Sequence, residues 1–304
     1  MSQIAFLGAI EVGLLFALVA LGVYLSFRVL QFPDLTVDGS FPLGAAVCAS
    51  LIVAGYNPYF ASLMAALAGA CAGMVTAWLN VRLKILHLLA SILTMIALYS
   101  INLRIMGRPN IALLGETTVF TPLEALAEAV GLPTYVLLPI ALFVLVILVK
   151  LALDWFLNSE VGLAMRATGV NPRMARAQGI HTNRYILGGM ALSNALVALA
   201  GALFAQSQGA ADVTLGVGVI VVGLAAVIGG EAVMNTATVF RATLACIIGS
   251  ILYRLAVAGA LNADLLGLKA QDLNLITAVL VTLAMVLPGV RMPFRGKRKG
   301  GVTP

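Results

Sequence analysis

The chain has 304 residues, of which 62% are hydrophobic and only 10% are charged, and its formal net charge is +6. An ordinary soluble domain has roughly 25% charged and roughly 45–50% apolar residues, so the composition excludes a soluble globular protein. Lys and Arg lie mostly in short loops and the C-terminal tail, with no basic face and no interleaved aromatic residues, which excludes a nucleic-acid partner.

Apolar residues occur in blocks of about 20, the length that a helix needs to cross about 30 Å of hydrocarbon. The blocks are Ile4–Phe27, Phe41–Gly55, Tyr59–Val81, Ile85–Met106, Tyr135–Phe156, Tyr185–Gln206, Val213–Gly230, Ala242–Ala260 and Leu273–Pro288. The second block is short and follows Gly39 and Pro42, which predicts a broken or re-entrant helix. The sequence therefore predicts an all-α fold, a single transmembrane helical bundle over residues 1–304 with about nine spans (eight to ten).

The third block carries a small residue at every fourth position, at Ala61, Ala65, Gly69, Gly73 and Ala77. Such stripes let helix backbones approach closely in membranes. Ordinary packing within the bundle is the favoured interpretation, and a dimer face is the alternative.

Basic residues are concentrated in alternate connections between the blocks. They are Arg82, Lys84, Arg166, Arg173, Arg176, Arg184 and Arg241, together with the basic tail of residues 289–304. Because Lys and Arg accumulate in cytoplasmic loops, we expect these connections and the C-terminus in the cytoplasm. The N-terminus is expected outside, and the membrane is expected to be a bacterial inner membrane.

The loop of residues 158–184 is much longer than a connection between two membrane helices needs. Residues 162–167 are predicted to form one short helix that Gly169 ends. Asn171 is a good helix N-cap and Pro172 suits the first helical position, so a second short helix is predicted to follow. Gly179 is expected to end that helix in the left-handed conformation.

Arg173 and Arg176 lie three residues apart and therefore share one face of the second short helix. A rigid, surface-docked pair of helices on the cytoplasmic side suits a groove on a soluble partner. Anchoring of the arginines to anionic lipid headgroups is the alternative.

The stretch Gly162-Leu-Ala-Met-Arg-Ala-Thr-Gly-Val-Asn-Pro-Arg-Met-Ala-Arg-Ala-Gln-Gly-Ile180 resembles the cytoplasmic coupling loop of ABC-importer permeases of the branched-chain amino acid and ribose type. Those loops typically read G-x-A-x-R-A-x-G-x-N-P-x-x-A-x-x-x-G-I, and this chain keeps every fixed position. The segment Phe32–Ala46 is similar to the corresponding part of the same permeases. It departs from their usual sequence pattern at Pro33-Asp34 and at residues 36–40, and this difference points to the uncharacterised branch of predicted tryptophan/tyrosine permeases.

The resemblance implies a homodimeric permease of the type II importer kind, driven by two cytoplasmic ATPase subunits and supplied by an extracytoplasmic binding protein. It assigns the contact with the ATPase to six residues of the loop: Arg166, Asn171, Pro172, Arg173, Arg176 and Gly179. The chain itself has no G-x-x-x-x-G-K-[ST] phosphate-binding motif. ATP is therefore expected on the partner subunit, and no cofactor is expected on this chain.

Four polar residues inside apolar blocks are candidates for the translocation pathway. Glu11 lies within the first block, where an ionisable group is a functional hypothesis by default, although pairing with Arg254 or a backbone group is favoured. Ser193 and Asn194 lie well inside the sixth block and Ser40 in the broken segment; interhelical hydrogen bonding is the favoured alternative for them. Asp34 and Asp38 flank Thr36 in a short polar turn, and Asp38 is expected to cap the broken second helix by accepting from backbone N–H groups beyond it. Lining of the translocation path is the alternative for this turn.

The transported solute is expected to be a small organic molecule, with an amino acid as one candidate. An ion-coupled secondary transporter is the alternative function, and it needs intramembrane acids. Glu11 is the strongest such acid in this reading, which disfavours that alternative. No catalytic set and no cluster with metal-ligand spacing occurs in the sequence, so we predict a transport subunit rather than an enzyme.

Overall fold

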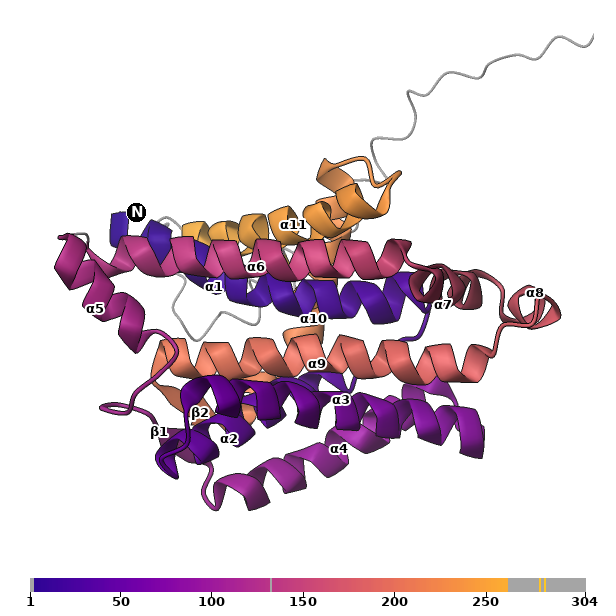
Figure 1. Ribbon diagram of the computed structural model, residues 1–304, viewed down its shortest axis with the longest axis horizontal. Helices are drawn as coiled ribbons and strands as arrows, with labels where there is room; N and C mark the ends of the chain where they lie inside the picture. Colours follow the sequence, from indigo (N-terminus) through magenta and orange to yellow (C-terminus); the bar gives the residue numbers. More distant parts are fainter. Residues whose placement is uncertain (1–2, 132, 262–278, 280–281, 283–304) are drawn as a thin grey trace, which may run out of the picture.

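Long apolar helices lying side by side make up most of the molecule (Figure 1). The computed structural model describes residues 3–131 and 133–261, together with 279 and 282. Within that part, 7 helices are long and apolar enough to cross a membrane. They are α1 with its π-helical continuation η1 (Gln3–Val23 and Tyr24–Val29), α3 (Pro58–Leu83), α4 (His87–Met106), α6 (Thr134–Asn158), α9 (Thr182–Gln208), α10 (Val219–Val233) with the preceding 3-10 turn η2 (Val213–Gly216), and α11 (Val239–Leu261).

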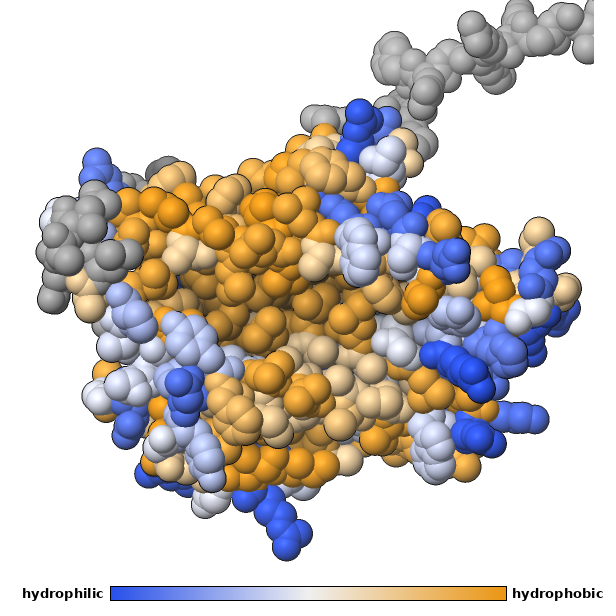
Figure 2. Space-filling view, viewed as in Figure 1, coloured by the Kyte–Doolittle hydropathy of each residue, from blue (hydrophilic) through white to orange (hydrophobic). Residues whose placement is uncertain are grey.

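The expected number of about nine spans is not confirmed. The second block is a shorter apolar helix, α2 (Val37–Val53), of 17 residues. The ninth block, Leu273–Pro288, falls almost wholly outside the described residues, and the basic tail 289–304 falls outside them entirely. Figure 2 shows apolar side chains over the middle of the bundle and polar ones gathered at its two ends, the pattern of a multi-pass membrane protein.

The end regions carry the short elements. One end has α5 (Thr121–Val130) and an antiparallel ribbon of β1 (Asn110–Ala112) with β2 (Ala210–Asp212), in which Asn110 pairs with Asp212. The ribbon was not expected from the sequence, because strands of three residues leave no readable alternation. Asp212 accepts bonds from the Thr214 hydroxyl and N–H, and these bonds hold the pKa of Asp212 below its usual range.

Two helices, α1 and α9, lie at the centre of the bundle. α1 contacts α6, α9, α10 and α11, whereas α9 contacts α2 and α3 on its other side. The contact with α3 uses the stripe of small residues, since a Cβ added at Gly69 or Gly73 would overlap the backbone of α9. Ala61, Ala65 and Ala77 are also completely buried. The packing interpretation of the stripe is therefore confirmed.

Helix α2 begins inside the bundle rather than at its surface. Residues 31–34, between η1 and α2, have no helical structure, and Ser40 of α2 bonds to Asn194 near the midpoint of α9. The turn η2, which precedes α10, lies against the start of α2, where a Cβ on Gly216 would overlap the Asp38 carbonyl oxygen. Gly39 and Pro42 lie within α2, not before it as expected, because the helix begins at Val37.

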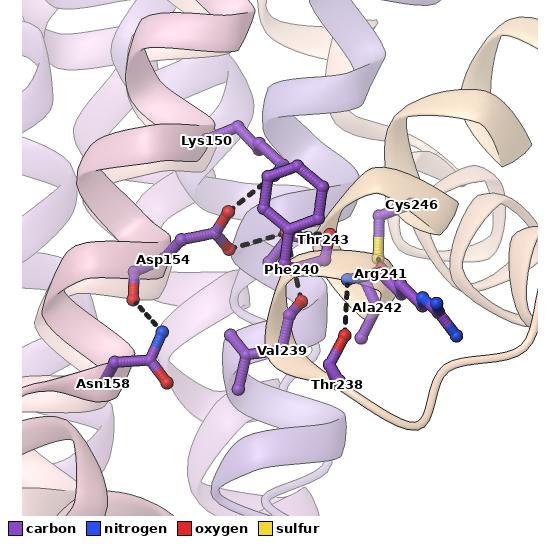
Figure 3. Close-up of polar contacts among 10 residues, drawn as sticks. All are labelled: Lys150, Asp154, Asn158, Thr238, Val239, Phe240, Arg241, Ala242, Thr243 and Cys246. Carbon is purple, nitrogen blue, oxygen red and sulfur yellow. Dashed lines mark hydrogen bonds and ion pairs between the residues drawn. The ribbon is translucent and has the colours of Figure 1, made fainter.

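A buried ion pair within α6 is in contact with two side chains of α11 (Figure 3). Lys150 Nζ lies 2.6 Å from Asp154 Oδ2, one helical turn away, and the Lys150 side chain is 1% exposed. The same ammonium lies 3.0 Å from the centroid of the Phe240 ring of α11. Thr243, also of α11, donates to Asp154 Oδ1 at 2.7 Å. Each of the two charged groups is therefore stabilised by a side chain of α11 as well as by the other member of the pair.

We predict that Lys150→Met destabilises the purified protein. Removing one partner of a buried ion pair leaves an uncompensated charge, which typically costs about 3–5 kcal/mol. The measurement is thermal unfolding in detergent, followed by the loss of the monodisperse peak in size-exclusion chromatography.

The double variant Lys150→Met/Asp154→Leu is the matched control, because it removes both charges and places an apolar side chain at each position. We expect it to recover most of the loss, as apolar replacements of a whole buried pair often do. A single variant as stable as the parent protein contradicts the role assigned to the pair.

Candidate functional site

A cluster of polar side chains lies in the interior where α2 meets α9. Asn194 of α9 donates through Nδ2 to Asp34 Oδ2 at 2.8 Å and accepts through Oδ1 from the Ser40 hydroxyl at 2.7 Å. All three residues are completely buried. In the described chain Asp34 forms no ion pair, and its carboxyl group accepts from the Asn194 side chain and the Thr36 N–H.

Hydrogen bonds of the cluster and its neighbours also reach the backbone around the start of α2. Asp34 Oδ1 accepts from the Thr36 N–H at 2.9 Å, and the Thr36 hydroxyl bonds to the Thr76 hydroxyl of α3 at 2.8 Å. Asn102 of α4 donates to the Gly39 carbonyl at 3.3 Å. Backbone groups freed by an interrupted helix need such partners inside a membrane.

Asp38 caps a different helix from the one expected. Its carboxylate accepts from the backbone N–H groups of Ile220 at 2.7 Å and Gly218 at 3.3 Å, at the start of α10. The prediction that it caps α2 is wrong, because Asp38 lies within the first turn of α2, after the N-cap residue Thr36. Carboxylates favour helix N-termini, where unbonded N–H groups and the helix dipole attract negative charge.

The other two pathway candidates lie apart from this cluster. Ser193 donates to the Gly22 carbonyl of α1 at 2.7 Å, on another face of α9. Glu11 accepts a hydrogen bond from Ser207 near the end of α9, rather than pairing with Arg254. The Arg254 guanidinium instead lies 4.1 Å from the centroid of the Phe16 ring.

The structure thus brings Ser40 and Asn194 together and leaves Ser193 and Glu11 elsewhere. Each of the four makes a hydrogen bond to another protein group in this conformation. Their assignment to the pathway stays a prediction.

The long loop folds into two short helices, α7 (Glu160–Val170) and α8 (Pro172–Ala177), at the end of the bundle away from the ribbon (Figure 1). Asn171 Oδ1 accepts from the N–H groups of Arg173 and Met174, both at 3.1 Å, and Pro172 is the first helical residue. Gly179 has a left-handed φ of 81°. The predicted cap and stop of this helix are therefore confirmed.

Gly169 does not end the first short helix, contrary to expectation, because α7 continues through it to Val170. Its role is close packing: a Cβ at Gly169 would overlap the carbonyl oxygen of Val29, at the end of η1. At the other end of α7, a Cβ on Gly162 would overlap the backbone of Leu157. Met165 is buried, and its sulfur lies 3.0 Å from where a Cβ on Gly189 of α9 would stand.

The outward side of this coupling segment, α7 with α8, combines exposed apolar and basic side chains. Val170 is 76% exposed and Met174 is 63% exposed, although both lie on a loop beyond the membrane helices. Arg173 and Arg176 are exposed beside them. A groove of about 410 Å³ runs between the two short helices and is lined by Leu163, Arg166, Val170, Asn171, Met174 and Ile180 among others.

Two ion pairs were not predicted from the sequence. Lys150 and Asp154 lie four apart inside an apolar block, a signal that could have found them, since intramembrane charges are rare and pair with one another. Arg28 binds the Glu231 carboxylate through Nε at 2.8 Å, and these residues are 203 positions apart. Nothing in the sequence relates Arg28 to Glu231.

Comparison with known proteins assigns the family. Residues 5–288 match the family model described as branched-chain amino acid transport system / permease component. The tyrosine transport system permease protein of Clostridioides difficile (strain R20291) is 38% identical over 268 residues, covering 88% of this chain and 86% of that protein. An uncharacterised protein of Rickettsia prowazekii (strain Madrid E) is 34% identical over 281 residues, covering 91% of this chain and 95% of its own length.

The solved structure of PsaBC from Streptococcus pneumoniae in complex with Fab shares the fold, with a TM-score of 0.50 and 14% identity over 93% of this chain and 90% of that chain. The match along almost the whole length agrees with the resemblance carried by the loop of residues 158–184. The chain belongs to the permease components of branched-chain amino acid transport systems, and it is the membrane component of an ABC-type transporter rather than an enzyme.

Proposed function

We propose that this chain is the membrane subunit of an ATP-driven importer in a bacterial inner membrane. Two copies assemble with two cytoplasmic ATPase subunits, which bind the ATP, and an extracytoplasmic binding protein delivers the substrate. The observation that carries the proposal is the coupling segment, whose exposed apolar and basic side chains lie beyond the membrane helices.

Exposed apolar residues on a water-facing loop favour a protein partner. Val170 and Met174 have no lipid to cover them if α8 extends past the ends of the spans, as Figure 1 draws it. Methionine adapts to irregular apolar surfaces, and arginine is enriched in protein interfaces. The groove between α7 and α8 can accept a side chain of that partner.

The packing of α7 supports a mechanical link from the ATPase to the bundle. Gly169 brings α7 against the end of η1, which continues α1, and Met165 packs at Gly189 of α9. α1 and α9 are the two central helices. A displacement of the coupling segment therefore reaches both of them directly, and α9 carries Asn194.

An aromatic amino acid of the tyrosine type is the proposed substrate. One support is the tyrosine transport system permease to which the chain is 38% identical. The other is that residues 33–40 depart from the usual sequence pattern of the branched-chain amino acid and ribose permeases. The orientation follows from the basic connections, so the C-terminus and the coupling segment lie in the cytoplasm.

We predict that the variant Arg173→Glu/Arg176→Glu no longer co-purifies with the ATPase subunit. Both side chains are exposed. Arg173 takes part in the cap through its backbone N–H, and the Arg176 side chain makes one surface bond, to the Pro172 carbonyl at 3.2 Å, so we expect the fold to survive the change. The measurement is the ratio of ATPase to permease after affinity purification of the co-expressed complex.

The control is Arg104→Glu/Arg108→Glu, which makes the same change of charge at two exposed arginines near the opposite end of the bundle. It is expected to retain the normal ratio. A normal ratio in the Arg173/Arg176 variant overturns the assignment of this surface.

We predict that Ser40→Cys and Ser193→Cys react with a small water-soluble thiol reagent in one nucleotide state of the complex and not in the other. Cysteine is nearly isosteric with serine, and the background lacks Cys48, Cys71 and Cys246. Ser250→Cys is the matched control, because Ser250 is equally buried and donates to the Gly13 carbonyl at 2.7 Å, as Ser193 does to Gly22. If Ser40→Cys and Ser193→Cys stay as unreactive as the control in every state, these serines are structural and the pathway lies elsewhere.

We predict ATP-dependent uptake of labelled tyrosine by proteoliposomes that contain the permease and its ATPase, with the binding protein on the opposite side. Excess unlabelled tyrosine should abolish the signal, and excess ribose should leave it unchanged. Uptake of leucine without tyrosine would refute the substrate assignment and keep the importer. Uptake that an ion gradient drives without ATP would instead favour a secondary transporter.

A further inference from the structure

Two hollows adjoin each other at the end of the bundle that carries the coupling segment. The first, of about 830 Å³, is lined by Arg82 of α3, by Arg176 and His181 of the loop, and by Arg184 of α9. The second, of about 480 Å³, lies between α7 and α9 and is lined by Phe156, Met165, Tyr185 and Leu192. His181 and Arg184 belong to the walls of both.

The first hollow gathers positive charge without a matching acid. Arg82 lies in the last turn of α3 and Arg184 at the start of α9, so both stand where a span meets the aqueous boundary. Neither forms an ion pair in the described chain, whose two pairs, Arg28–Glu231 and Lys150–Asp154, involve other residues. Like charges held around one hollow favour an anion between them.

The second hollow continues from this boundary into the apolar part of the bundle. Leu192 follows Arg184 by eight residues on α9, which places it about 12 Å deeper along the helix. Gly188 lies between them, and a Cβ added there would meet no atom within 4 Å. The surface of α9 is therefore open at Gly188, one helical turn beyond Arg184.

We propose that an anionic diacyl phospholipid binds here, with its phosphate headgroup between Arg82 and Arg184 and one acyl chain along α9 at Gly188. Basic pockets between membrane helices bind anionic headgroups. A free phosphate would use only the first hollow. A soluble ATPase would not reach the depth of Leu192. The proposal is independent of the transported substrate and leaves Arg176 to the coupling surface.

The test measures lipid retained by the purified permease in native mass spectrometry after exchange into phosphatidylglycerol mixed with phosphatidylcholine. The parent protein is expected to retain phosphatidylglycerol in preference. Arg82→Gln/Arg184→Gln should weaken that retention roughly fivefold for each cation removed. Gly188→Phe should reduce it by filling the second hollow while all charges remain.

Each variant has a matched control. Arg104→Gln/Arg108→Gln removes the same charge near the opposite end of the bundle, and Gly229→Phe adds the same side chain at another glycine with open space around it. Both controls should retain phosphatidylglycerol as the parent does. Size-exclusion chromatography verifies that all four proteins are folded.

Equal retention by the parent, Arg82→Gln/Arg184→Gln and Gly188→Phe overturns the proposal. Competition by glycerophosphoglycerol, which has the headgroup and no acyl chains, as strong as that of the lipid also overturns it and leaves an anion site only. Loss of ATPase co-purification with unchanged lipid retention assigns the surface to the ATPase instead.

Discussion

The rest of the structure depends on how the interrupted helices satisfy their backbone groups away from water. Residues 31–36 precede α2 without α-helical structure, and α10 begins inside the bundle, where its first N–H groups have no acceptor within the helix. Asp34 and Asp38 accept from these two backbones, and Asn102 donates to the carbonyl of Gly39. Because an unsatisfied backbone group in hydrocarbon costs several kcal/mol, these side chains fix where α2 and α10 begin, and so fix the interior of the bundle.

The same constraint explains why polar groups concentrate around α9. The contacts of α9 with α2 and α3 are made at glycines, so the helix backbones lie close together there. Bulky side chains would not fit between the helices at these contacts. Asn194 bonds to Ser40 of α2 and to Asp34, which precedes α2, and Ser193 bonds to the Gly22 carbonyl of α1. These bonds and close backbone contacts tie α9 to both α1 and α2, which suits the proposed transmission of movement from the coupling segment to the interior.

Much of the local structure follows from short-range physical chemistry that the sequence states directly. Asn171 and Pro172 predict the start of α8, Gly179 its end, and the blocks of about 20 apolar residues predict the long helices. The prediction that Gly169 ends a helix is wrong for a physical reason. A glycine within a helix can mark either its end or a close approach, and only the position of Val29, 140 residues earlier in the chain, distinguishes the two.

By itself, the sequence determined the membrane class, the long helices, the capped coupling segment and, through the motif of residues 162–180, the type of transporter. Composition, hydropathy and caps depend on neighbours along the chain, so they can be read without a fold. Tertiary structure alone decided that Asp38 caps α10, that Arg28 pairs with Glu231, and that Glu11 bonds to Ser207. These partners are 180 or more positions apart, and a carboxylate accepts equally well from any donor that the packing of the helices brings within reach.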